Sequence, residues 1–195
     1  MLADKKKEDE QEKPESFAER LLKSRTILVA EGISKELAEK VSTRLLLLDQ
    51  DDDEKPVKVY INSPGGDVDA GFAIYDMCRF INAPVISICA GLTASAAVLV
   101  LLAAPKDRRV SLPNSRFLLH QPSMGVRGST ADIQIEANEI LKMKDRINKL
   151  IADETGQDID KVEKDTHRNF WMDPEEAVEY GLVDKVIESK KDIEE

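Results

Sequence analysis

The stretch Ile88–Ala104, read as ICAGLTASAAVLVLLAA, decides the fold of this chain. It predicts the end of an apolar strand, Val85–Ala90, then a turn at Gly91 and an apolar helix from about Ala94. Ser95 lies at this junction among alanines. A helix N-terminus carries unpaired N–H groups and partial positive charge, so a serine there suits a nucleophile. Serine is also a favoured helix N-cap, and this structural interpretation stays open.

The neighbouring segments alternate between strand-like and helix-like patterns. Apolar runs at Pro56–Asn62 and Pro84–Ala90 predict buried strands. The segments that follow them, from about Val68 to Ile81 and from about Ala94, predict helices. This alternation indicates a parallel α/β core. Shorter strands are expected at Thr26–Ala30, Arg108–Ser111, Arg116–His120 and Leu182–Ile187, and further helices near Phe17–Leu22, Ser34–Leu48, Asp158–Asp165 and Pro174–Gly181.

The longest helical pattern runs from Thr130 to about Glu154, with a cap at Ser129 or Thr130 and an end at Gly156. Its apolar positions are spread more widely than one narrow stripe. This pattern fits either an ordinary surface helix or a helix that also contacts another subunit.

Composition and charge divide the chain into a domain and two tails. Residues 1–15 form a highly charged tract, interpreted as a mobile arm because it has too little apolar surface to order itself. Residues 16–188 are expected to form a single domain, and 189–195 a solvated C-terminal tail.

Several classes of protein are disfavoured by composition. A net charge of −10 argues against a nucleic-acid surface. Cys78 and Cys89 lie in apolar segments without metal-ligand spacing, which indicates two buried thiols in a reducing compartment. The N-terminus lacks the pattern of a secretory signal, and the longest apolar run is shorter than the about 20 residues that span a bilayer. The sequence therefore predicts a soluble cytoplasmic protein with no membrane partner.

A glycine-containing loop, Ser63-Pro64-Gly65-Gly66, joins a predicted strand to a predicted helix. It lacks the Gly-Lys-Ser/Thr ending of a phosphate-binding loop, and one interpretation is an ordinary structural turn. The other interpretation pairs the N–H of Gly66 with that of Ala96 as an oxyanion hole, which would stabilise the charged oxygen of a tetrahedral intermediate.

A serine nucleophile needs a base, and the chain has two histidines. His120 ends a predicted strand and precedes Gln121-Pro122, so it falls at the sheet edge where active sites of open α/β folds gather. From its position alone, a purely structural role for His120 is as well supported as a role as catalytic base. His167 lies among charged residues and is interpreted as a surface side chain.

Five motifs occur in one order along most of the chain, from about Phe17 to Ile187. They are VYINSPGG at Val59–Gly66, GLTAS at Gly91–Ser95, LPNSR at Leu112–Arg116, HQP at His120–Pro122 and EAVEYGLVD at Glu176–Asp184. In order and spacing these segments resemble ClpP, the proteolytic subunit of the Clp protease family.

The resemblance implies a fold and a set of site residues. The fold is the α/β ClpP/crotonase-like superhelix of repeated β-β-α units, with a protruding handle helix at about residues 125–155. Ser95 matches the family's nucleophile, His120 its general base, and Gly66 and Ala96 its oxyanion-hole donors. No metal or other cofactor is implied for the chain itself, because ATP is used by the partner ATPase.

The resemblance also implies an assembly and partners. Family members form heptameric rings that stack into a barrel-shaped tetradecamer with the serines inside. An AAA+ unfoldase of the ClpX, ClpA or ClpC type docks outside and feeds in unfolded polypeptides. Tyr60 matches a residue of the docking cleft. The N-terminal segment matches the axial pore loops, or is instead a removable leader.

Two positions depart from the family pattern. The third triad member is usually an aspartate, and the aligned residue here is Asn169. An asparagine can accept the Nδ1–H of a histidine but cannot offset imidazolium charge. Asp165 is an alternative third member. The residues that flank Ser95, Gly91–Ala96, also differ from those of many relatives.

Three functions therefore compete. The first is a serine endopeptidase subunit of an ATPase-dependent protease, with a Ser95–His120–Asn169 triad. The second is a catalytically weak or silent ClpP paralogue that acts as a regulatory or structural subunit of a mixed barrel. The third is an acyl-CoA hydratase or isomerase on the same crotonase-like fold, which has no need for the serine and histidine.

Overall fold

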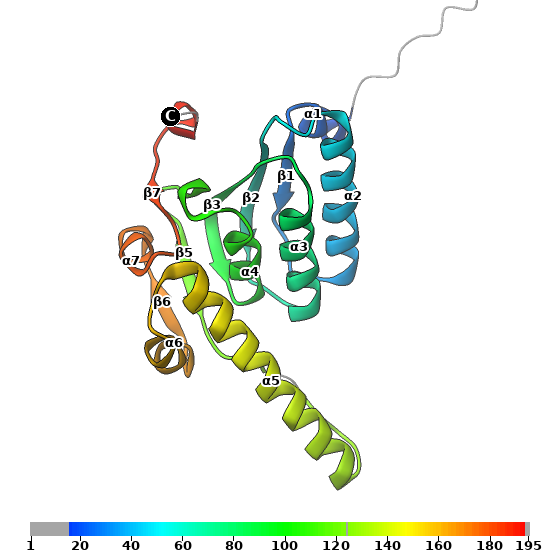
Figure 1. Cartoon of the computed structure of the whole chain (residues 1–195), viewed down its shortest axis with the longest axis vertical. Helices are drawn as coiled ribbons and strands as arrows, with labels where there is room; N and C mark the ends of the chain where they lie inside the picture. The colour runs from blue at the N-terminus through cyan, green and yellow to red at the C-terminus, as the bar shows by residue number, and fades with distance from the viewer. Residues whose placement is uncertain (1–15, 124, 194–195) are drawn as a thin grey trace, which may run out of the picture.

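The computed structural model describes residues 16–123 and 125–193, and the predicted N-terminal arm, residues 1–15, lies outside the described residues. The strands are β1 (Thr26–Val29), β2 (Val57–Ser63), β3 (Val85–Ala94), β4 (Arg109–Ser111), β5 (Arg116–Leu119), β6 (Phe170–Met172) and β7 (Lys185–Val186). The α-helices are α1 (Phe17–Lys23), α2 (Lys35–Asp51), α3 (Val68–Phe80), α4 (Ala96–Leu102), α5 (Thr130–Thr155), α6 (Ile159–Thr166) and α7 (Pro174–Tyr180), with short 3₁₀ helices η1 (Lys106–Arg108) and η2 (Lys190–Ile193). Figure 1 shows their arrangement.

The sheet has the order β1-β2-β3-β4-β7, and each neighbouring pair in it is parallel. The turn expected at Gly91 is wrong, because β3 continues to Ala94. Its first half pairs with β4, and its second half, Leu92–Ala94, pairs with β5. Gly91 has φ of 123°, a conformation that suits glycine, and it lets the strand bend between its two partners.

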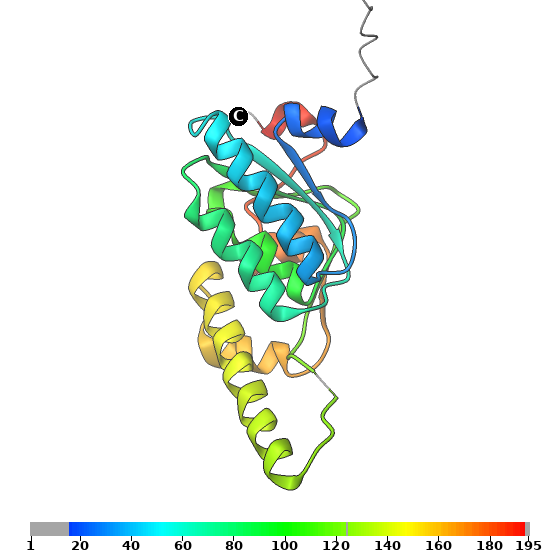
Figure 2. The same ribbon diagram turned by 90° about the vertical axis from the view of Figure 1, so that its right-hand side faces the viewer.

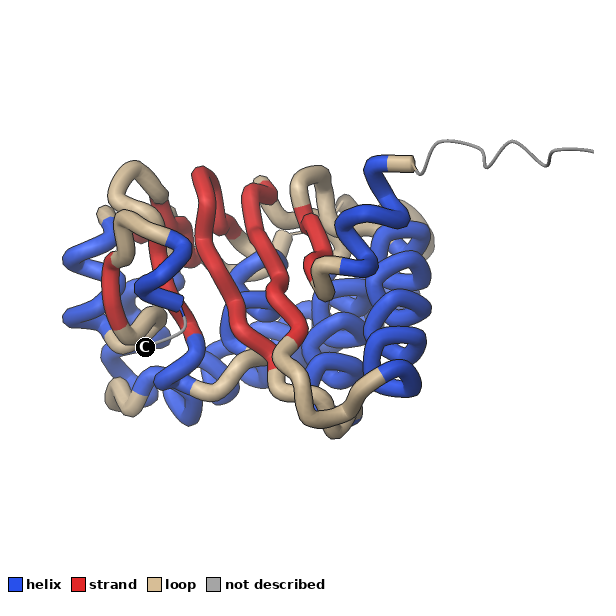
Figure 3. The backbone as a smooth tube through the Cα atoms, turned by 90° about the horizontal axis from the view of Figure 1, so that it is seen from above, coloured by secondary structure: helices blue, strands red, loops and turns tan. Residues whose placement is uncertain are grey.

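The two faces of the sheet are covered differently. In β2, Val57, Val59 and Ile61 are fully buried in the main core, while Tyr60 points to the other face. Helices α2, α3 and α4 lie over the first face, behind the strands in Figure 3. The second face carries a small cluster of Ile88, Val110 and Ile187, with Tyr60, Ile86, Leu112 and Ile193 packed against it.

Helix α5 projects from the body of the molecule, and the residues before it run beside it (Figures 1 and 2). Its start is fixed by a capping box between Ser129 and Asp132, and its end by Gly156 in the left-handed conformation. Its buried residues are Asn148, Ile151 and Thr155, all in its second half. The helix is therefore anchored at its C-terminal end.

A buried ion pair makes this anchor. The Arg109 side chain is fully buried and forms a salt bridge with Glu154 of α5. It also donates to the backbone carbonyls of Ala104, Glu154 and Leu102. The Tyr75 hydroxyl of α3 donates to the same carboxylate at 2.9 Å. These bonds satisfy the charges that burial takes out of water.

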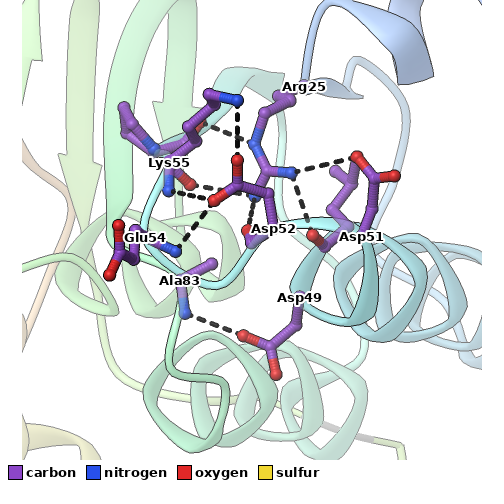
Figure 4. Close-up of polar contacts among 9 residues, drawn as sticks. Arg25, Asp49, Asp51, Asp52, Glu54, Lys55 and Ala83 are labelled. Carbon is purple, nitrogen blue, oxygen red and sulfur yellow. Dashed lines mark hydrogen bonds and ion pairs between the residues drawn. The ribbon is translucent and has the colours of Figure 1, made fainter.

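The C-terminal end of α2 is held by Arg25 (Figure 4). Its guanidinium donates to the carbonyls of Leu48, Asp52, Lys55 and Pro56. A cation at a helix C-terminus satisfies the last carbonyls and complements the helix dipole. The loop between α2 and β2 is thus tied to Arg25, the residue before β1.

Two features were not expected from the sequence. The C-terminal tail is partly folded, because Asp192 accepts the N–H groups of Glu188 and Ser189 and turns the chain into η2. The strand β6, which pairs antiparallel with β5, was not expected from the sequence. The helix η1 was also not predicted. The other strands and the α-helices confirm the predicted elements to within a few residues at each end, although the predicted strand Leu182–Ile187 shortens to β7.

Candidate active site

Ser95 occupies a strained turn between β3 and α4. Its φ is 54° and its ψ is −126°, a region that non-glycine residues rarely adopt. Ser95 does occupy the N-cap position of α4, as the structural interpretation expected, but its side chain makes no capping hydrogen bond. Its N–H donates to the Leu118 carbonyl of β5 at 2.9 Å, which ties the turn to the neighbouring strand. The hydroxyl is therefore left for another use.

The loop Ser63–Gly66 packs directly on this turn. A Cβ at Gly65 would lie 2.6 Å from the Ser95 Cβ and 2.5 Å from the Ala94 oxygen, so no side chain fits there. The loop is fixed by a hydrogen bond from the Ile33 N–H to the Gly65 carbonyl. Among the described residues, no acceptor is found for the N–H of Gly66 or of Ala96. The Ala96 N–H comes directly after the serine, and the Gly66 N–H comes directly after the glycine that packs on it.

His120 follows the end of β5 and is half-buried. It lines one small pocket together with Ser95 and Ala96. The other residues of the pocket are apolar: Val68, Val98, Leu99, Leu119, Pro122, Ile147 and Ile151. The structure therefore brings the predicted nucleophile and the predicted base together, with apolar walls from α3, α4 and α5.

The orientation of the imidazole is fixed by its own neighbour in the chain. His120 Nδ1 lies 2.8 Å from the Gln121 carbonyl oxygen. The Gln121 N–H donates to the Thr166 carbonyl at 2.7 Å, and its Nε2 donates to the His167 carbonyl at 2.9 Å. The end of α6 therefore fixes Gln121, whose carbonyl contacts the imidazole of His120.

The two residues weighed as third triad member differ in position: Asn169 lies beside His120, one residue beyond the paired Leu119 and Phe170 of β5 and β6, whereas Asp165 lies on α6. Asn169 is exposed, and no hydrogen bond joins it to His120 within the described residues. The Asp165 carboxylate accepts from Lys161 Nζ at 2.9 Å and from the Tyr180 hydroxyl at 3.1 Å, so it serves a contact between α6 and α7. The His167 side chain is exposed, as expected for a surface residue.

The comparisons with known proteins decide the family. A family model described as Clp protease matches residues 9–190. The chain belongs to the Clp protease family. The ATP-dependent Clp protease proteolytic subunit 2 of Treponema denticola is 51% identical over 181 residues, which cover 93% of this chain and 90% of the relative. Subunit 3 of Rhizobium etli is 49% identical over 173 residues, 89% of each chain.

A solved structure confirms the fold of this Clp protease subunit. An asparagine-to-aspartate variant of ClpP1 from Listeria monocytogenes superposes with a TM-score of 0.84 at 44% identity. The match covers 89% of this chain and 97% of that structure. The ClpP-like α/β fold is therefore confirmed, and the chain is similar to proteolytic subunits of the Clp protease.

Tyr60, the predicted docking residue of this Clp protease subunit, is half-buried on the face of the sheet opposite α2–α4. Burial raises the pKa of its hydroxyl.

Gln121 was missed as a site residue. The only sequence signal was its place between His120 and Pro122, since its role depends on a backbone turn and on α6, more than forty positions away.

Among the described residues, no helix is long and apolar enough to cross a membrane.

Proposed function

We propose that this Clp protease subunit is a serine endopeptidase, with Ser95 as nucleophile and His120 as general base. The observation that carries the proposal is the strained, uncapped Ser95 turn, which shares one pocket with His120. Strain of this kind costs about 1–3 kcal/mol and gathers at functional sites. A serine whose only role is to begin a helix does not require this backbone strain.

The chemistry follows from these positions. The Ser95 Oγ attacks the scissile carbonyl carbon, and its proton passes to His120 Nε2. The N–H groups of Gly66 and Ala96 donate to the oxyanion that forms. When the tetrahedral intermediate collapses, the C–N bond breaks and the leaving amine takes the proton from His120. Water, deprotonated by His120, then attacks the acyl-enzyme carbonyl carbon. The ester C–O bond breaks, the Ser95 Oγ takes the proton back from His120, and the peptide leaves with its new carboxyl terminus.

The assembly and its partners belong to the same proposal. The apolar side chains of Ile133, Ile135 and Leu141 on α5 are 44–58% exposed in the single chain, which supports a contact with other subunits in a double-ring barrel. An AAA+ unfoldase would dock at the face that carries Tyr60 and deliver unfolded polypeptides. The subunit itself would use no cofactor. The free buried thiols Cys78 and Cys89 support a reducing compartment such as the cytoplasm.

The test is hydrolysis of a short fluorogenic peptide by Ser95→Ala. Turnover should fall by at least about 10³-fold, because the variant lacks the hydroxyl that forms the acyl-enzyme. Ser123→Ala is the matched control, since Ser123 is exposed and lies just beyond the His120–Pro122 segment. The assembly size of both variants should equal that of the parent. Turnover near the parent rate in Ser95→Ala would contradict the proposal, and an inactive parent in every condition would favour the silent-paralogue alternative.

A further inference from the structure

We propose that the backbone carbonyl of Gln121 sets the tautomer of His120, and that Gln121 is the positioning residue of the site. In this arrangement the carbonyl takes the part that the sequence assigns to the side chain of Asn169. The catalytic consequence rests on the proposed function, but the tautomer itself does not.

The first step concerns the bond at Nδ1. His120 Nδ1 lies 2.8 Å from the Gln121 oxygen, and a carbonyl oxygen can only accept. The hydrogen must therefore be on Nδ1. A neutral imidazole carries one N–H, so Nε2 keeps its lone pair and can accept a proton from a hydroxyl. The next residue, Pro122, has no backbone N–H that could donate to Nδ1 instead.

The second step concerns what fixes the carbonyl. Gln121 is bound at two points, through its N–H to the Thr166 carbonyl and through its side-chain amide to the His167 carbonyl. Thr166 is itself fully buried, and its hydroxyl contacts the Val162 carbonyl and the Asn148 amide, each at 2.9 Å. The support thus runs from α5 through α6 to the histidine by direct hydrogen bonds.

The third step compares the two groups that could hold Nδ1–H. The amide of Asn169 is exposed and can rotate, so it can present either an oxygen or an NH₂ to the ring. The Gln121 carbonyl is fixed by its backbone and can present only an oxygen. The carbonyl therefore specifies the productive tautomer more strictly than an asparagine would. It bears no full charge, however, so it stabilises the imidazolium less than an aspartate does.

The experiment is ¹⁵N solid-state NMR of the sedimented full-length assembly, labelled at histidine. The chain has two histidines, and His167→Gln removes the second while keeping the carbonyl that accepts from Gln121. The spectrum is recorded at about pH 8.5, where an ordinary imidazole is neutral. The proposal predicts a proton on Nδ1 and none on Nε2 of His120. A proton on Nε2 in the parent would overturn it.

Two variants separate the candidate partners of Nδ1. Asn169→Ala should leave the Nδ1–H tautomer unchanged and alter fluorophosphonate labelling by less than about threefold, whereas a wrong tautomer costs about 10⁴-fold in a serine protease. Gln121→Met keeps the side-chain length but cannot donate to His167. It should lower the Nδ1–H fraction and the labelling rate by about three- to tenfold, the scale of one lost hydrogen bond, with kcat affected and KM not.

Gln157→Met is the matched control. Gln157 Nε2 donates to the Tyr180 carbonyl at 2.9 Å, the same kind of bond away from the pocket, so this variant should match the parent in both measurements. Loss of the Nδ1–H tautomer in Asn169→Ala, or identical behaviour of the two Gln→Met variants, would overturn the inference. If Gln121→Met fails to assemble, the parent and Asn169→Ala spectra still decide. An Nδ1–H tautomer without any labelling of Ser95 would reject the proposed function and leave the tautomer assignment standing.

Discussion

At the scale of single residues, Ser95 combines a costly backbone with a free side chain. Its left-handed conformation is held by the close approach of Gly65 on one side and by the Leu118 carbonyl on the other. Any side chain at position 65 would collide with the turn, so the glycine and the serine depend on each other. The sequence showed the serine among small residues, but the strain arises from tertiary contacts that no local pattern records.

The change Asn169→Asp tests whether charge at this exposed position limits the rate. We expect peptide hydrolysis to rise by less than about tenfold, because Gln121 already fixes the tautomer and solvent screens an exposed carboxylate. The measurement is kcat/KM of the assembled variant against the parent. A rise of about 10³-fold or more would show that the missing carboxylate, and not the carbonyl, determines the orientation of His120.

The two cysteines should be inert in the folded chain. Burial raises the pKa of both the Cys78 and the Cys89 thiol to about 12, so the thiolate is scarce near neutral pH. At about pH 8 an aromatic disulfide reagent should release no chromophore from the native protein on the timescale of its reaction with free cysteine. The same chain unfolded in guanidinium should release two equivalents. Fast reaction of native protein would contradict the burial of these thiols.

At the scale of elements, β3 determines the arrangement of the sheet and the site. Its apolar alternation was visible in the sequence, but its continuation past Gly91 was not, because glycine usually marks a turn. The continuation depends on β5, which arrives later in the chain and pairs with Leu92–Ala94. The Leu92 N–H also donates to the Asn62 side chain at the end of β2. Strand partners of this kind lie outside any local window of sequence.

The Arg25 contacts at the end of α2 predict a large loss of stability on truncation. Arg25 has a positive φ of 53°, and alanine keeps the Cβ, so the backbone strain is the same in both proteins. The change in the free energy of unfolding therefore reports mainly the loss of the guanidinium. We expect the free energy of unfolding to fall by about 3 kcal/mol, since the carbonyls of Leu48 and its neighbours lose a charged donor.

The measurement is urea denaturation at one fixed protein concentration, because assembly contributes to apparent stability. Arg20→Ala is the control and should change the free energy by no more than about 0.5 kcal/mol, since Arg20 is exposed on α1. Equal losses in the two variants would show that the cluster in Figure 4 contributes no special stability.

At the scale of the whole molecule, the apolar surface left uncovered in one chain indicates how chains assemble. Helix α5 projects with exposed apolar residues, and the Tyr60 face of the sheet lacks the helical cover of the other face (Figures 1 and 3). The sequence predicted the length of α5 from its periodicity and caps. The sequence did not predict that η2 would bring Ile193 into the small cluster around Ile88 that also contains Tyr60. That contact joins the C-terminal segment to residues in the first half of the chain.

Truncation of Tyr60 tests the proposed docking face. Tyr60→Ala should weaken binding of the unfoldase and slow degradation of a folded protein, because a few buried aromatic side chains supply much of the binding energy of a protein interface. Hydrolysis of a short peptide does not require the unfoldase and should stay within about twofold of the parent. Tyr60→Phe should behave like the parent, since burial alone, with no hydrogen bond among the described residues, raises the pKa of the hydroxyl. Equal loss of both activities in Tyr60→Ala would indicate a disrupted assembly and contradict a docking role.

The most direct test of the whole account is the intact mass of the purified assembly after treatment with a fluorophosphonate. An activated serine should take up one adduct per chain, and Ser95→Ala should take up none, while Ser123→Ala labels like the parent. This result would show that Ser95 is activated although Asn169 replaces the usual aspartate. Parent protein that stays unlabelled, or an adduct that persists in Ser95→Ala, would contradict the account.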